Sequence, residues 1–146
     1  MPTYTVKYSN FILSSNQKKR IAEGITQVHK KTTGANTYFA QVIFSDNKKN
    51  DHFMGGKFVK DKQLFLHGEI RAGRSNEIKN KLIKGLRSSL VKNSGLSKDQ
   101  IWVYILDLPP NQMIEYGEIL PASGMEKIWY SKLPADLKKK LKKLES

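Results

Sequence analysis

The chain has 146 residues, of which 38% are hydrophobic, and it carries a formal net charge of +13. This length favours a single domain with its own core. Because the sequence contains no cysteine, it excludes a disulfide framework, a thiolate nucleophile and a zinc site built on thiolates. No apolar run approaches the roughly 18 residues of a membrane span, and the N-terminus lacks the apolar segment of a secretory signal. We therefore predict a cytoplasmic protein without a membrane partner.

The first half of the chain predicts a strand, a helix and a second strand. Residues 2–8 alternate in side-chain character, which is a strand pattern. Ser14 or Ser15 can cap a helix that runs to about residue 33, where Gly34 suits its end. Residues 38–44 (YFAQVIF) favour a second strand. The apolar stripe of the helix consists of Ile21, Ile25 and Val28.

The same order recurs in the second half. Residues 63–70 predict a strand, Ser75 opens a helix to about residue 93, Gly95 follows, and residues 101–106 predict another strand. The stripe of this helix consists of Ile78, Leu82, Leu86 and Leu90. Two β-α-β units, at about 2–44 and 63–106, can form an α+β fold with a four-stranded sheet and both helices on one face. The other face then needs a cover, and oligomerisation is one solution.

Three further segments complete the chain. The polar stretch 45–62 predicts turns, and 111–131 predicts irregular structure. We place a domain boundary after residue 133. Residues 134–146 predict an amphipathic lysine-rich helix with Leu137, Leu141 and Leu144 on its apolar side.

The basic residues suggest nucleic acid, acidic surfaces or small anions as partners. They are dispersed over different predicted elements and no recognised nucleic-acid motif accompanies them, so solvated surface charge is the simpler interpretation. A module that binds nucleic acid or an anionic partner remains an alternative function. The clusters are Lys18–Arg20, Lys30–Lys31, Lys48–Lys49 and Lys138–Lys143.

Pro2 follows the initiator Met1 directly. If Met1 is removed, Pro2 carries a free secondary amine. An α-amino group titrates at about 7.7–8.0, so this amine could act as an acid or a base near neutral pH. Simple N-terminal processing, without catalysis, is the common alternative for a Met-Pro start.

Five other residues are candidates for chemistry. Arg71 and Arg74 flank a short turn just before the predicted Ser75 helix, where two guanidiniums could bind a carboxylate or a phosphate. His29 lies at the edge of an apolar stripe, and Tyr104 faces away from Ile101, Val103 and Ile105 on its strand. Glu115 falls in the segment predicted to be irregular. Each residue also has an ordinary structural interpretation: solvated arginines, a hydrogen-bonded histidine, a packed tyrosine and an exposed carboxylate.

Taken together, these residues resemble the tautomerase superfamily, and within it the cis-3-chloroacrylic acid dehalogenase family. The similarity runs from Pro2 to about Trp129. It is best at AQV (40–42), HGEIRAGRS (67–75), IWVY (101–104) and QMIEYGEILP (112–121). That family uses a proline, a histidine, two arginines, a tyrosine and a glutamate, which match Pro2, His29, Arg71, Arg74, Tyr104 and Glu115 in order.

The resemblance implies a tautomerase-type fold and a homotrimer. It also implies addition of water, without a metal or cofactor, to a small α,β-unsaturated carboxylic acid, with 3-halogenated acids included. Arg71, Arg74 and His29 would bind the substrate carboxylate. Glu115, assisted by Tyr104, would take a proton from water, and protonated Pro2 would protonate C2. The charge of Pro2 stays open, because arginines lower an amine pKa and carboxylates raise it. A neutral Pro2 would favour keto–enol tautomerisation of a phenylenolpyruvate-like acid, whereas Glu115 favours hydration.

Overall fold

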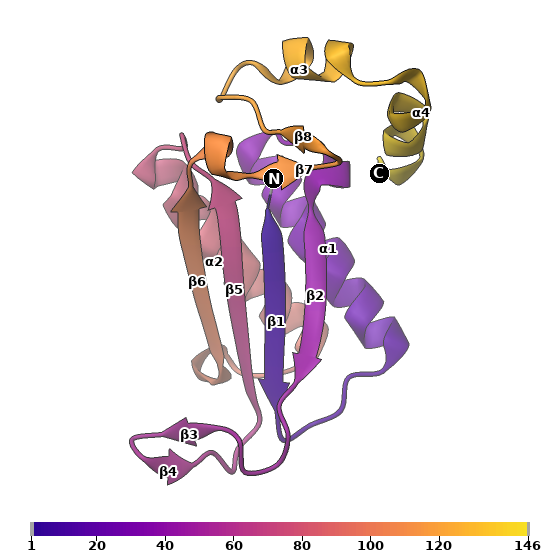
Figure 1. The fold of residues 1–146 in the computed structure, drawn as a ribbon. Helices are drawn as coiled ribbons and strands as arrows, with labels where there is room; N and C mark the ends of the chain where they lie inside the picture. The colour runs from indigo at the N-terminus through magenta and orange to yellow at the C-terminus, as the bar shows by residue number, and fades with distance from the viewer. Residues whose placement is uncertain (1, 146) are drawn as a thin grey trace.

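A four-stranded mixed sheet forms the centre of the molecule (Figure 1). The structure is a computed structural model, and it describes residues 2–145. β1 is parallel to β2 and β5 is parallel to β6, while β1 and β5 are antiparallel neighbours. The two predicted β-α-β units are therefore confirmed, and they join through β1 and β5. In the sheet order β2-β1-β5-β6, the bounds are Gln41–Asp46, Thr3–Ser9, Gln63–Arg71 and Ile101–Leu108.

Helices α1 (Ser15–Thr33) and α2 (Asn76–Ser94) cover the same face of the sheet (Figure 1). Their apolar stripes pack on the inward side chains of β1 and β5 and form the main core. The expected α+β architecture with both helices on one face is thus confirmed. Five helix residues in this core are at most 1% exposed: Ile21, Ile25, Leu82, Leu86 and Leu90.

Local signals at the helix ends explain where both helices begin and stop. The Ser14 hydroxyl accepts a hydrogen bond from the Gln17 backbone N–H, and the Gln17 side chain accepts one from the Ser14 N–H. At the other end Gly34 has a φ of 72°, a left-handed conformation that glycine adopts without a steric cost. Ser75 and Gly95 take the corresponding places at α2.

The predicted strand at 38–44 is wrong at its start. Thr37–Phe39 forms a 3-10 turn (η1), and β2 begins only at Gln41. The backbone N–H of Ala40 donates to the Thr37 carbonyl and closes this turn. Phe39 is buried in a second apolar cluster with Leu120, which Trp129 also joins. The aromatic residues that suggested a strand therefore pack against the C-terminal part of the chain.

The polar stretch 45–62 contains turns, as expected, and it also forms a small hairpin of β3 (Phe53–Met54) and β4 (Lys57–Phe58). The stretch 111–131 is more regular than predicted. It holds a second hairpin and a short helix, because its apolar residues pack on Phe39. The bounds are η2 Lys98–Gln100, η3 Pro110–Gln112, β7 Ile114–Glu115, β8 Glu118–Ile119 and α3 Glu126–Lys132.

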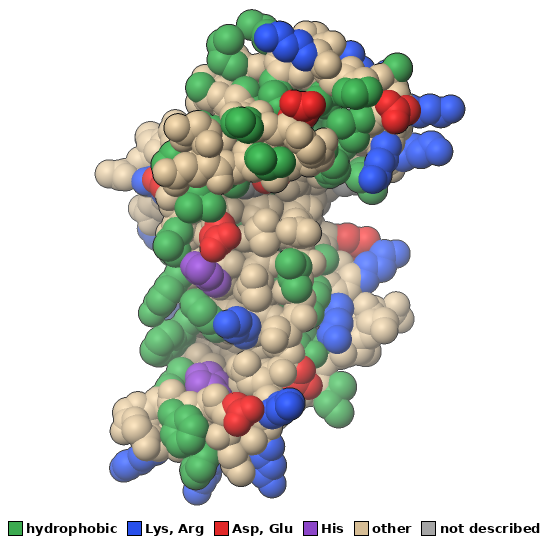
Figure 2. All heavy atoms as spheres, in the orientation of Figure 1, with side chains coloured by type: hydrophobic (Ala, Val, Ile, Leu, Met, Phe, Trp, Pro, Cys, Tyr) green, Lys and Arg blue, Asp and Glu red, His purple; other side chains and the backbone are tan. Residues whose placement is uncertain are grey.

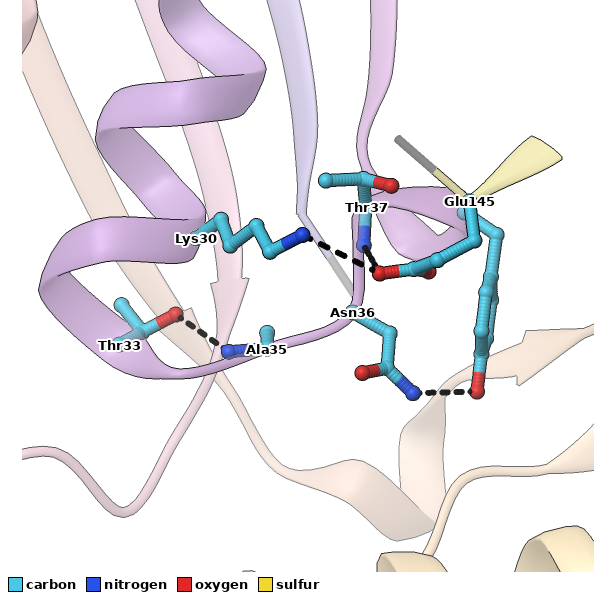
Figure 3. Close-up of polar contacts among 7 residues, drawn as sticks. Lys30, Thr33, Ala35, Asn36, Thr37 and Glu145 are labelled. Carbon is cyan, nitrogen blue, oxygen red and sulfur yellow. Dashed lines mark hydrogen bonds and ion pairs between the residues drawn. The ribbon is translucent and has the colours of Figure 1, made fainter. Parts of the chain in front are cut away.

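The C-terminal helix α4 (Ala135–Leu144) docks on η1 through Leu141, which is fully buried. Just beyond α4, the Glu145 carboxylate accepts a hydrogen bond from the Thr37 backbone N–H at 3.4 Å (Figure 3). The same carboxylate pairs with Lys30 of α1 at 3.5 Å. Glu145 therefore links α1 to η1, the turn that precedes β2.

Among residues 2–145, no helix covers the face of the sheet opposite α1 and α2, which the β3–β4 hairpin only borders. Figure 2 shows hydrophobic side chains gathered along its β6 edge. Trp102, Tyr104 and Leu106 of β6 are 46%, 51% and 47% exposed, while Val103 and Ile105 pack on the core. The expected orientation of Tyr104 away from the core is thus confirmed. Within residues 2–145, no helix has both the length and the apolar character to cross a membrane.

Candidate active site

The sheet topology brings the start of β1 to the end of β5. Thr3 is paired with Glu69 in the antiparallel register, so Pro2 lies level with Ile70 and next to Arg71. Pro2 is buried, and its carbonyl accepts a hydrogen bond from the Gln41 N–H at 3.0 Å. Figure 1 shows this end of the sheet beneath the β7–β8 hairpin. The predicted removal of Met1 concerns a residue outside the described range.

Arg71 is buried at the end of β5, with only 4% of its surface exposed. One terminal nitrogen, Nη1, donates to the Pro121 carbonyl at 2.8 Å, and the other, Nη2, pairs with the Glu126 carboxylate. A third nitrogen, Nε, is buried and has no hydrogen-bond partner among the described residues. Because a buried donor without a partner is costly, this atom marks a place where a ligand acceptor would be stabilising.

Arg74 lies close to Arg71, because the chain turns back at Ala72–Gly73 before α2. Its Nη1 donates to the Arg71 carbonyl. Burial lowers the pKa of Arg74, and the Arg71 charge lowers it further. Two guanidiniums are therefore held together at the helix start, an arrangement that favours binding of an anion.

His29 is buried on α1 and is bonded to Tyr4, a residue that the sequence analysis did not select. Its Nδ1 lies 2.8 Å from the Tyr4 hydroxyl, and its Nε2 is buried without a partner among the described residues. Tyr4 stands two residues after Pro2 on the same alternating side of β1, which is the signal that could have identified it. A Cβ on Gly68 would come within 2.5 Å of the Tyr4 ring, so glycine there fixes the ring in place.

Burial keeps both members of this pair neutral. It lowers the pKa of His29 to about 3, with a further decrease from the Arg74 charge. Burial also raises the pKa of Tyr4 well above its ordinary value. If the Tyr4 hydroxyl donates to Nδ1, the histidine proton sits on Nε2. The orphan Nε2–H would then be a donor for a ligand carboxylate.

We expect His29 to remain neutral in NMR spectra of the imidazole nitrogens at all pH values above about 4. Because the unfolded histidine titrates near about 6.5, the unfolded state binds the proton first as the pH falls. The free energy of unfolding should therefore decrease between about pH 6.5 and 3, and it should be unaffected by this group above 6.5. Urea titrations across this pH range should show that the free energy of unfolding decreases less steeply with falling pH in His29→Gln than in the wild-type protein. An equally steep decrease in that variant would contradict this assignment.

Glu115 lies in β7, at the edge of a hollow of about 470 Å³. Thr3 and Gln41 also line this hollow, so it is next to the buried Pro2 at the same end of the sheet. Tyr116 follows with a φ of 56°, and its hydroxyl donates to the Tyr38 carbonyl of η1. The hairpin that carries Glu115 is therefore anchored to the η1 turn, and Glu115 does not lie in the irregular segment that the sequence suggested.

Tyr104 does not line the same hollow as Glu115. It lines a different hollow, of about 620 Å³, with Trp102, Phe65 and the β3–β4 hairpin. The structure thus gathers Pro2, His29, Arg71, Arg74 and Glu115 at one end of the sheet. It places Tyr104 midway along the edge strand β6, on the open face.

Comparisons with known proteins place this arrangement in a family. A family model described as "Putative oxalocrotonate tautomerase enzyme" matches residues 1–132. The chain belongs to the tautomerase superfamily. No curated protein sequence matches this tautomerase-superfamily chain.

Solved structures agree with this membership. The crystal structure of N1, a member of the cis-3-chloroacrylic acid dehalogenase family, is 28% identical with a TM-score of 0.92, and the match covers 97% of this chain and 99% of N1. The match therefore extends beyond Trp129 into the lysine-rich tail. A fused 4-OT symmetric trimer is 19% identical to this chain, with a TM-score of 0.74. The match covers 84% of this chain and 98% of the fused 4-OT chain, and the two share the fold.

Proposed function

We propose that this protein adds water to small α,β-unsaturated carboxylic acids, including 3-halogenated ones, with Pro2 as the terminal catalytic amine. The observation that carries this proposal is the pair of orphan buried donors, Arg71 Nε and His29 Nε2, beside the second guanidinium of Arg74. A carboxylate would satisfy donors of this kind. The similarity to N1, a member of the cis-3-chloroacrylic acid dehalogenase family, supports the choice of reaction.

In the proposed reaction the two arginines and His29 hold the substrate carboxylate and stabilise the enediolate charge that develops on it. Glu115 takes a proton from water as the water oxygen attacks C3, and the π electrons move to form the C2 enediolate. The Pro2 ammonium then gives its proton to C2. With a halogen on C3, the resulting halohydrin loses the halide and the hydroxyl proton, which leaves malonate semialdehyde.

Tyr104 enters this proposal through a second copy of the chain. It is half exposed on a sheet face with no cover from its own helices, and it lines a different hollow from Glu115. In a trimer packed through this face, Tyr104 of one copy would approach Glu115 of the next and orient it. The fused 4-OT neighbour with the same fold is a trimer, which supports this assembly.

Keto–enol tautomerisation of an enol carboxylate is the second candidate. The description of the matching family model favours it. The two reactions use the same carboxylate site and differ in the charge on Pro2, because a neutral Pro2 would take a proton where an ammonium would give one.

The proposal is tested by chloride release from cis-3-chloroacrylate. We expect turnover by the protein, and a decrease of about 10²–10³-fold in kcat/KM for Arg74→Ala, since that change removes a preorganised donor to the developing charge. Arg87→Ala removes the same charge from the exposed side of α2 and should leave turnover unchanged. Absence of chloride release, together with turnover of phenylenolpyruvate, would replace hydration by tautomerisation.

A further inference from the structure

The anion site already contains a carboxylate of its own. Glu126, the first residue of α3, pairs with Nη2 of Arg71 and is the only acidic side chain that the structure pairs with either guanidinium within residues 2–145. The Arg71 side chain is 5% exposed and that of Glu126 is 38% exposed. This ion pair is therefore buried on the Arg71 side and reaches solvent on the Glu126 side, where Glu126 lines a hollow with Tyr38 and Phe39.

Glu126 remains charged in this position. Burial by itself raises its pKa, but the hydrogen bond and the charge of Arg71, with backbone N–H groups, outweigh burial and hold the pKa of Glu126 below its ordinary value. Near neutral pH the carboxylate is thus a fixed negative charge beside Arg71.

A charge count around the two guanidiniums follows from these contacts. The charged groups that act on Arg74 are Arg71, Asp107 and Glu126. Asp107 is already paired with Lys79 at 2.8 Å, so those two charges cancel locally. Two guanidinium charges and the one carboxylate of Glu126 then leave a net charge of +1 around the arginines. The proposed Pro2 ammonium and the Glu115 carboxylate carry opposite charges and do not change this sum, so a ligand with one negative charge would compensate it.

The hydrogen bonds of the two guanidiniums leave donors for a ligand carboxylate. Arg71 bonds through one N–H of each terminal nitrogen, to Pro121 and Glu126, and its buried Nε has no partner among residues 2–145. Arg74 donates to the Arg71 carbonyl through Nη1. Each guanidinium has five N–H donors, so those that remain can serve the oxygens of a substrate carboxylate. A second negative charge beside Arg71 would face the Glu126 carboxylate, which is already paired there.

We propose that Glu126 is a specificity-determining residue, which restricts the site to acids with a single carboxylate by neutralising Arg71 and repelling a second negative charge. This inference rests on the proposed function, since it assigns the substrate carboxylate to the same two arginines. It adds a selection against dicarboxylates, made by a residue on a helix outside the sheet.

The test uses two saturated acids that cannot be hydrated, propionate and malonate, so that binding is measured without turnover. Backbone amide shifts of Ala72 and Gly73 report the site in NMR titrations of the full-length protein at constant ionic strength. We expect wild-type protein to favour propionate. In Glu126→Gln the ratio of the malonate Kd to the propionate Kd should fall about tenfold, because an amide of the same shape no longer repels the second charge.

Two variants separate charge from structure. Glu126→Asp keeps the charge and should retain the wild-type ratio, and Glu23→Gln, which removes an exposed carboxylate on α1, should also leave the ratio unchanged. A Glu126→Gln protein that weakens both acids equally, or changes neither, would overturn the inference while the carboxylate site stands. Failure of the wild-type protein to bind either acid at Ala72 and Gly73 would overturn the proposed function together with the inference.

Discussion

Pro2→Ala should lower kcat for hydration by about 10²–10⁴-fold, the usual contribution of a positioned general acid. Alanine still presents a terminal amine after Met1 is removed, so the change is not simply the loss of a basic group. The pyrrolidine ring holds the nitrogen in one place, whereas a primary amine on alanine can rotate. Because Pro2 is buried at the end of the sheet, this difference in position should reach the reacting carbon directly.

The measurement is the rate of hydration in a single turnover. The intact mass of each protein checks that Met1 has been removed, so that residue 2 carries the terminal amine. Pro134→Ala is a matched control, since Pro134 is exposed and lies just before α4, outside the sheet. A sharper variant keeps one residue ahead of Pro2. Its nitrogen becomes a tertiary amide that can neither donate nor accept a proton, so full activity in that protein would refute a catalytic Pro2.

Glu115→Gln should suppress hydration by about 10²–10⁴-fold while it leaves tautomerisation of phenylenolpyruvate within a few fold of the starting rate. Only hydration needs a base to take a proton from water, whereas tautomerisation needs only Pro2 and the carboxylate-binding donors. The amide has the same shape as the carboxylate, so the β7–β8 hairpin should keep its position over the hollow.

Glu118→Gln is the control, because Glu118 is the cross-strand partner of Glu115 on the same hairpin. It removes the same charge one strand away and should leave both activities unchanged. Equal losses of hydration and tautomerisation in Glu115→Gln would show that Glu115 shapes the site or binds substrate, and would remove its role as the base for water.

Much of the fold could be predicted because its signals are local. The stripes at Ile21–Ile25 and Leu82–Leu90, with serine at one end of each helix and glycine at the other, specify two helices without reference to the rest of the chain. The strands between them alternate or are continuously apolar, and the β-α-β order then fixes which strands are parallel.

The missed features depend on distant partners. Tyr38 and Phe39 carry strand-forming side chains, but packing on Trp129 and Leu120 turns that segment into η1. The bond between Tyr4 and His29 could not be predicted, because nothing near Tyr4 in the sequence indicates that partner. The arginine pair could be found from its spacing, whereas its neutralisation by Glu126, more than fifty positions later in the chain, could not.

The contacts of Glu145 limit how the protein can be handled in the laboratory. Its carboxylate joins α1 to η1, so an affinity peptide or a fluorescent protein attached behind it would pull on the turn that precedes β2 (Figure 3). An attachment ahead of Pro2 would place a bulky group at the same end of the sheet, beside the proposed site. The tip of the β3–β4 hairpin, at Gly55–Gly56, projects away from both and has open space around it. An internal label inserted there is the better choice.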